Sequence, residues 1–158
     1  MVVDRDHLVA ELFGIVNVPT TIWIDEDGRI VRPPCIAPAD NTFRDFTHID
    51  AGIHNDALRK WVRDGVTPLD DTEIRSRLGP PSVNVQQARA ERRLGMHLLR
   101  NGNRPGAERH LATAMELAPE DFTIHRGTMP VLGSDPFGQE FFDFYEGWEA
   151  AGRPGYDS

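Results

Sequence analysis

The sequence is poor in the residues that thiol chemistry and membrane insertion require. Cys35 is the only cysteine among 158 residues, so the chain cannot form an intramolecular disulfide or supply two thiols for exchange. No window reaches the roughly 18 consecutive apolar residues that a transmembrane helix needs. Residues 1–6 lack a basic segment followed by an apolar run, the pattern of a secretory signal. We therefore expect a reducing, cytoplasmic setting and no membrane partner.

Positive charge is also scarce and is not gathered into a stripe. The chain carries 17 basic and 25 acidic side chains, for a formal net charge of -8, and Lys60 is its only lysine. A protein that binds nucleic acid needs a basic patch that neutralises phosphates. The composition therefore argues against nucleic acid as a partner.

The common catalytic and cofactor motifs are absent from the sequence. There is no nucleophile elbow, phosphate loop or dinucleotide fingerprint. His7, His48 and His54, taken with Asp50 and Asp56, fit no familiar spacing of metal ligands. We expect neither a metal nor a cofactor, and the sequence favours a chain that is not itself an enzyme.

A short helix and a hairpin are predicted near the start of the chain. Apolar residues over 7–13 have helical spacing, with Asp6 as a candidate cap and Gly14 as the stop. A run of β-branched and aromatic residues over 21–24 predicts a buried strand. A turn at 25–28 leads to a returning strand at 29–32.

Two prolines follow this hairpin. Because proline cannot donate to a strand ladder, we expect Pro33 and Pro34 to end the second strand. A helix is predicted from Asp56 to Asp64, with Asn55 as its cap. Residues 66–85 are rich in proline and glycine and predict a connection between two units.

The run from Gly14 to Val31, GIVNVPTTIWIDEDGRIV, resembles the second half of a thioredoxin-like fold. It is similar to the bacterial TlpA/ResA-type thiol oxidoreductases and the redoxins. The resemblance implies that Pro19 is cis and that Val18, Pro19 and Thr20 form a loop that binds substrate. It also implies a Cys-x-x-Cys on an earlier helix, and this sequence contains none.

The second half of the chain predicts a helical hairpin and a C-terminal helix. Segments 86–100 and 105–118 form an antiparallel pair with a pattern that resembles one tetratricopeptide repeat of about 34 residues, counted from Ala88. We identify no second repeat. The residues that carry this pattern, which we expect to pack the two helices together, are Leu94, Gly95, Leu98, Ala107, Leu111, Ala114 and Pro119.

A final helix is predicted over 136–151, with a stripe of aromatic side chains on one face. Phe137, Phe141, Phe144 and Trp148 recur at helical spacing. So large an apolar surface must be covered, and the helix pair just upstream is the expected partner.

These patterns predict an α/β fold, a partial thioredoxin-like sheet with helices, over 1–79, followed by an all-α region over 80–158. The first functional hypothesis is a member of the thioredoxin-like thiol-disulfide oxidoreductase family without redox activity of its own. The alternative is a non-catalytic module that binds proteins through its tetratricopeptide-like helices. A sheet without its central strands exposes an edge, so we expect a homo-oligomer or a separately encoded partner half.

Overall fold

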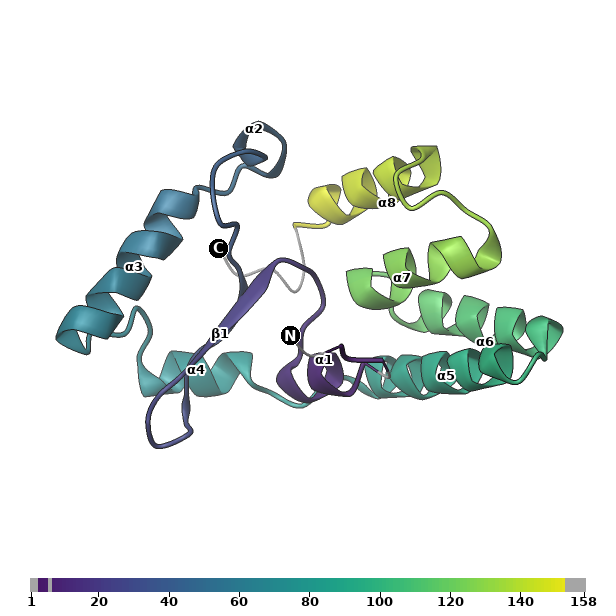
Figure 1. Ribbon diagram of the computed structural model, residues 1–158, viewed down its shortest axis with the longest axis horizontal. Coiled ribbons are helices and arrows are strands. Elements are labelled where there is room, and N and C mark those ends of the chain that lie inside the picture. Colours follow the sequence, from purple (N-terminus) through teal and green to yellow (C-terminus); the bar gives the residue numbers. More distant parts are fainter. Residues whose placement is uncertain (1–2, 6, 153–158) are drawn as a thin grey trace. The chain divides into compact units, whose positions relative to one another are not determined.

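The computed structural model describes residues 3–5 and 7–152, which form two compact units. The helical unit combines residues 3–17 with 81–152, and the sheet unit spans 18–80. The predicted 1–79 domain is thus divided, because residues 3–17 belong with the helices. The elements in chain order are α1 (Leu8–Phe13), β1 (Thr20–Ile24), β2 (Ile30–Ile36), α2 (Arg44–Thr47), α3 (Ala51–Asp64), α4 (Asp71–Arg77), α5 (Val83–Arg100), α6 (Arg104–Leu117), α7 (Phe122–Leu132) and α8 (Gln139–Ala150) (Figure 1).

The sheet unit contains an antiparallel hairpin of β1 and β2. Its turn is closed by Asp25, whose Oδ1 accepts hydrogen bonds from the backbone N of Asp27 at 3.0 Å and of Arg29 at 2.8 Å. Gly28 has a φ of 79°, which glycine adopts at little steric cost. The predicted strand, turn and returning strand are therefore confirmed at these positions, but the expectation of a buried strand holds only at Trp23, since Ile24 is 45% exposed.

The expectation that Pro33 and Pro34 end the second strand is wrong. β2 continues through both prolines to Ile36. The register runs from Trp23 opposite Arg32 to Thr21 opposite Cys35, so β2 carries one extra residue at this point. Such a bulge interrupts the ladder, and prolines are tolerated there because no donor is needed.

The expected start of the next helix is also wrong. α3 begins at Ala51 rather than at Asp56, and its cap is Asp50 rather than Asn55. The Asp50 carboxylate accepts a hydrogen bond from the backbone N of Gly52 at 2.8 Å. This cap offsets the low helix propensity of Gly52 in the first turn.

The core of the sheet unit lies around Trp23, which is 4% exposed. Its ring stacks on Trp61 of α3 with the centroids 5.2 Å apart, and the ring of His54 meets it edge-on at 5.6 Å. The Arg32 guanidinium lies 4.8 Å from the Trp23 ring centroid. These contacts hold α3 against the hairpin.

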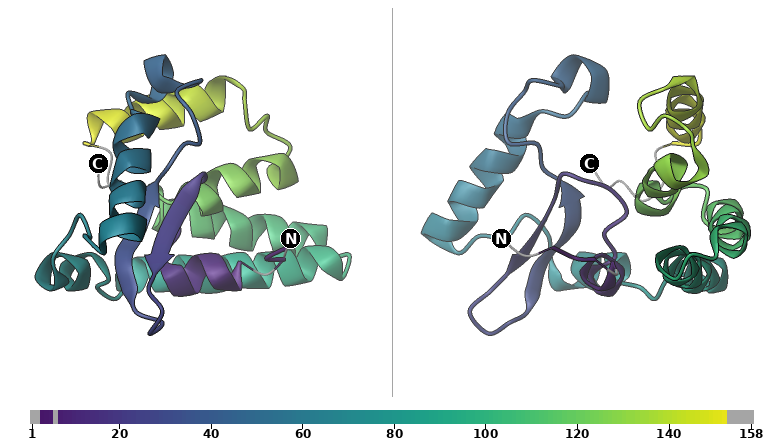
Figure 2. Two further views of the ribbon diagram at one scale, coloured as in Figure 1. Left: turned by 60° about the vertical axis from the view of Figure 1, so that its left-hand side comes forward. Right: turned by 45° about the vertical axis from the view of Figure 1, so that its right-hand side comes forward.

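The helical unit is built from α5, α6, α7 and α8, which Figure 2 (right) views nearly along their axes. The pair α5 and α6 is antiparallel, and its two helices are in tight contact at Gly95. A Cβ placed there would lie 2.8 Å from Cγ of Leu111 and 3.2 Å from the carbonyl oxygen of Ala107. Only glycine fits this contact without a shift of its neighbours.

A second helix pair, α7 and α8, follows the first, although the sequence revealed only one. Its buried positions lie 34 residues after buried positions of the first pair, which is the spacing of the predicted repeat. The correspondence holds for Phe122, Met129, Phe141, Tyr145 and Trp148, which follow Ala88, Gly95, Ala107, Leu111 and Ala114.

The aromatic side chains of α8 pack mainly on α7, a helix that the sequence did not predict. Phe122 is 5% exposed, and its ring centroid lies 4.6 Å from that of Phe144 and 5.0 Å from that of Trp148. Phe137, predicted to join the stripe, precedes α8 and is 70% exposed. These ring contacts of the stripe are thus with α7 rather than with the predicted pair over 86–100 and 105–118.

Candidate functional site: the docking of α1 on α5 and α7

Helix α1 has only six residues, and its start is held by Asp4. The two carboxylate oxygens of Asp4 accept hydrogen bonds from the backbone N of Leu8 at 2.9 Å and of Ala10 at 3.0 Å. Asp6, the predicted cap, lies outside the described residues. Helices of this length are unstable alone in water, so α1 depends on the surface that it contacts.

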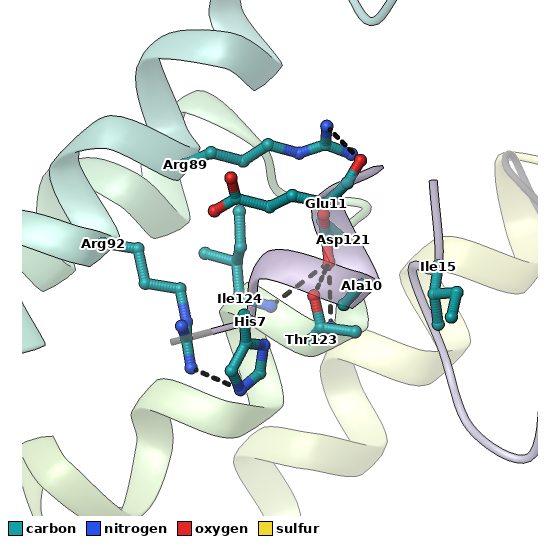
Figure 3. A pocket seen from close by; sticks show the side chains of 9 residues that line it. All are labelled: His7, Ala10, Glu11, Ile15, Arg89, Arg92, Asp121, Thr123 and Ile124. Carbon is teal, nitrogen blue, oxygen red and sulfur yellow. Dashed lines mark hydrogen bonds between the residues drawn. The ribbon is translucent and has the colours of Figure 1, made fainter. Parts of the chain in front are cut away.

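That surface is formed by three arginines of α5, which we call the arginine face: Arg89, Arg92 and Arg93. Their spacing puts all three on one side of the helix. Arg89 Nη1 donates to the carbonyl oxygen of Glu11 at 3.1 Å (Figure 3). Arg93 Nη1 lies 3.4 Å from Oε2 of the same residue. Glu11 is thus bound through both its backbone and its carboxylate.

The third arginine contacts His7, the residue that precedes α1. Arg92 Nη2 lies 2.9 Å from Nε2 of His7 (Figure 3). Because a guanidinium only donates, His7 Nε2 must accept, and the imidazole is therefore neutral. Burial of the ring, followed by the charge of Arg92, lowers the pKa of His7. Docking of α1 and loss of the His7 proton accordingly favour each other.

The opposite wall of the site is the start of α7, where Asp121 is the cap. Its Oδ1 accepts hydrogen bonds from the backbone N of Thr123 at 2.9 Å and of Ile124 at 3.2 Å (Figure 3). Asp121 is 5% exposed, and burial raises the pKa of its carboxyl. The backbone N of Thr123 also donates to the carbonyl oxygen of Val16 at 3.1 Å, which fixes the chain beyond α1.

The space left between these walls is small. It has a volume of about 10 Å³, which matches roughly one water molecule. Its lining residues are His7, Ala10, Glu11, Ile15, Arg89, Arg92, Asp121, Thr123 and Ile124 (Figure 3). A cavity of this size holds no more than a small solvent molecule.

The predicted substrate loop lies in the sheet unit. The peptide bond between Val18 and Pro19 is cis, the geometry that the resemblance implies. Val18 is 72% exposed, and the Pro19 carbonyl oxygen accepts a hydrogen bond from the backbone N of Ala37 at 3.3 Å. Thr20 begins β1 opposite Ile36.

The single thiol is buried in the hairpin near this loop. Arg32 Nε donates to the Sγ of Cys35 at 3.0 Å, and Oγ1 of Thr21 lies 3.6 Å from the same sulfur. His54 Nε2 lies 3.5 Å from Oγ1 of Thr21. Burial and the charge of Arg32 lower the pKa of His54, so its ring is neutral near pH 7. Cys35 is 8% exposed, which restricts the access of any reactant to its sulfur.

The predicted packing residues of the first helix pair fall into two groups. Gly95, Ala107, Leu111 and Ala114 are buried. Leu98 is half-buried and Pro119 is exposed after α6. Leu94 is 43% exposed, so it lies mainly outside the contact between the helices.

No protein-family model matches this chain, and no curated protein or solved structure matches it at a significant level. The thioredoxin-like and tetratricopeptide-like resemblances therefore stay predictions. Among the described residues, no group of three or more histidine, cysteine or acidic side chains could hold a metal ion. No described helix is both long and apolar enough to cross a bilayer.

Sequence reasoning missed the α1 site, although part of its signal was present. The run Arg89-Ala90-Glu91-Arg92-Arg93 places three cations on one face of a helix, a spacing that can be recognised in the sequence. Nothing local links that face to Glu11, which is 78 residues from Arg89. The pairing could only be found in three dimensions.

Proposed function

We propose that the helical unit is a non-catalytic interaction module that binds a short acidic helix across the arginine face and the start of α7. The observation that carries this proposal is the docked position of α1. This six-residue helix is remote in sequence from α5 and is bound there through Glu11 and His7.

Two further features support a binding role. The buried positions of the two helix pairs recur at 34 residues, the period of repeats whose stacked helices present binding surfaces. The contacts to α1 at Glu11 and His7 are polar or charged, and no residue of α1 is buried. A helix that docks on a preformed surface is a common mode of peptide recognition.

A peptide copy of residues 3–17 tests this function against the full-length chain. Replacing Leu12 by proline should undock the resident helix, because proline removes a helical hydrogen bond and clashes with the preceding turn. Leu12 is 73% exposed, so little packing is lost. We expect a labelled peptide to bind Leu12→Pro about tenfold or more tightly than the unmodified chain, since the vacant fraction sets the apparent affinity. Fluorescence anisotropy measures this binding.

Leu12→Ala is the matched control for the chain, because it removes the same side chain and keeps the helix. It should bind the peptide no better than the unmodified chain. A peptide with Glu11→Arg should not bind, because it sets like charges against Arg89 and Arg93. Absence of binding to Leu12→Pro, or equal binding of the reversed-charge peptide, would refute the proposed function.

A second candidate function concerns the sheet unit, and the order of its elements favours it. We propose that residues 18–80 derive from the second half of a thioredoxin-like domain and have no redox activity of their own. Support comes from the sequence β1, turn, β2 and helix α3, in which β1 has β2 as its one neighbour among the described strands. An edge of this kind can pair with a strand from a second copy or from another chain.

Insulin reduction by dithiothreitol tests the redox part of this second candidate. Dithiol exchange needs an attacking thiolate and a second, resolving thiol, and the chain has one cysteine. We expect the reduction rate with the chain to equal the rate with its Cys35→Ser variant. A faster rate with the unmodified chain would show that Cys35 is active.

A further inference from the structure

On one edge of the Arg92 guanidinium, one of the two donor nitrogens has a hydrogen-bond partner and the other has none among the described residues. The Nε and Nη2 hydrogens of an arginine point in the same direction and match the two oxygens of a carboxylate. In this structure Nη2 donates to Nε2 of His7 at 2.9 Å. Nε is buried and has no hydrogen-bond partner within the described part of the chain.

The environment of this edge lacks a direct counter-charge. Arg92 is 6% exposed, and no ion pair joins it to a carboxylate among the described residues. Asp4, Glu11 and Asp121 act on it only at longer range. His7 cannot supply the missing interaction, because a neutral imidazole offers one acceptor nitrogen.

Resting on the proposed function, we propose that the partner of the arginine face is an acidic helix of another protein that presents a carboxylate where His7 lies. Two carboxylate oxygens would satisfy both Nη2 and Nε of Arg92, and the negative charge would neutralise a buried cation. A second carboxylate, one turn further along the partner, would take the place of Glu11 beside Arg93. In this view α1 is a weaker resident ligand, which such a partner displaces.

Three peptides of residues 3–17 test this inference on the Leu12→Pro chain: the native peptide, His7→Glu and His7→Gln. Glutamate and glutamine have the same shape and reach, so they differ only in charge and in the second acceptor. We expect His7→Glu to bind about tenfold more tightly than the native peptide, and His7→Gln to bind like the native peptide. In a chain that also carries Arg92→Lys, which keeps the charge and loses the paired donors, the gain of His7→Glu should shrink to the part that comes from charge alone.

A measurement within the full-length chain avoids any loss of folding caused by a change at the buried Arg92. The backbone amides of residues 8–13 should exchange hydrogen about tenfold more slowly in the His7→Glu chain than in the His7→Gln chain. Equal exchange in the two chains, or equal affinity of their peptides, would overturn the inference. The proposed function would still stand if the native peptide binds, and it would fall together with the inference if no peptide binds.

Discussion

Replacing Phe122 by alanine should lower the free energy of unfolding of the helical unit by about 3–5 kcal/mol. Phe122 is 5% exposed and joins α7 to α8. Its ring centroid lies between 4.6 and 6.5 Å from those of four aromatic residues, Phe141, Phe144, Tyr145 and Trp148. Truncation leaves a cavity that rigid rings cannot fill, and it also removes edge-to-face contacts. Urea unfolding followed by circular dichroism measures the loss.

Phe137→Ala is the matched control, because it removes the same side chain from an exposed position. Phe137 is 70% exposed, and its ring centroid lies 4.4 Å from the Arg126 guanidinium. We expect a loss of about 1 kcal/mol or less, which is the scale of an exposed cation–π contact. Equal losses at the two positions would mean that Phe122 is not the centre of this aromatic cluster.

Leu111→Ala should destabilise the helical unit by about 2–5 kcal/mol, because Leu111 is 0% exposed and fills the space beside Gly95. Thermal unfolding with Leu94→Ala as control measures the effect, since Leu94 is the same residue at 43% exposure on α5. The control should lose clearly less stability than Leu111→Ala. Combining Leu111→Ala with Gly95→Ala tests whether the two positions act through one contact.

Gly95→Ala alone should destabilise by about 1–3 kcal/mol, because its Cβ would lie 2.8 Å from Cγ of Leu111. In the Leu111→Ala background that atom is gone, so the added methyl group should cost less or stabilise. The double-mutant cycle thus yields a coupling between the two positions. Additive effects would show that Leu111 does not determine the need for glycine at position 95.

The local features of the chain were predictable where a single short-range interaction decides them. The Asp25–Gly28 turn is one case, and the end of α3 at Gly65 is another. Asp70 caps α4 and forms a reciprocal capping box with Glu73, a local pattern within the predicted connection over 66–85. In each case the partners lie within four residues of one another, so the sequence contains the whole interaction.

Errors arose where tertiary packing overrides a local breaker. Helix α7 includes Gly127 and Pro130, residues that discourage a helical prediction. Its cap Asp121 and the buried Phe122 and Met129 compensate for these two residues. Likewise, β2 passes through two prolines because a bulge relaxes the ladder there. Neither compensation can be recognised without knowing the neighbouring element.

The α1 site was missed for a different reason. Its contacts join residues that are remote in sequence, such as His7 and Arg92, which are 85 positions apart. The sequence shows three arginines at 89, 92 and 93, and their spacing indicates that they lie on one side of a helix. Only the fold shows that a buried guanidinium there meets a neutral imidazole rather than a carboxylate.

The division of the chain at residues 17 and 80 has a consequence for how the protein is made. Residues 3–17 leave the ribosome before the sheet unit, and the helices that receive them are synthesised after it. Closing a loop of this length slows assembly, because the ends must find each other before any contact is gained. The sheet unit can fold in the meantime as an inserted domain. During this interval α1 has no native surface to bind, so the helical unit is completed only after α5 and α7 have been synthesised.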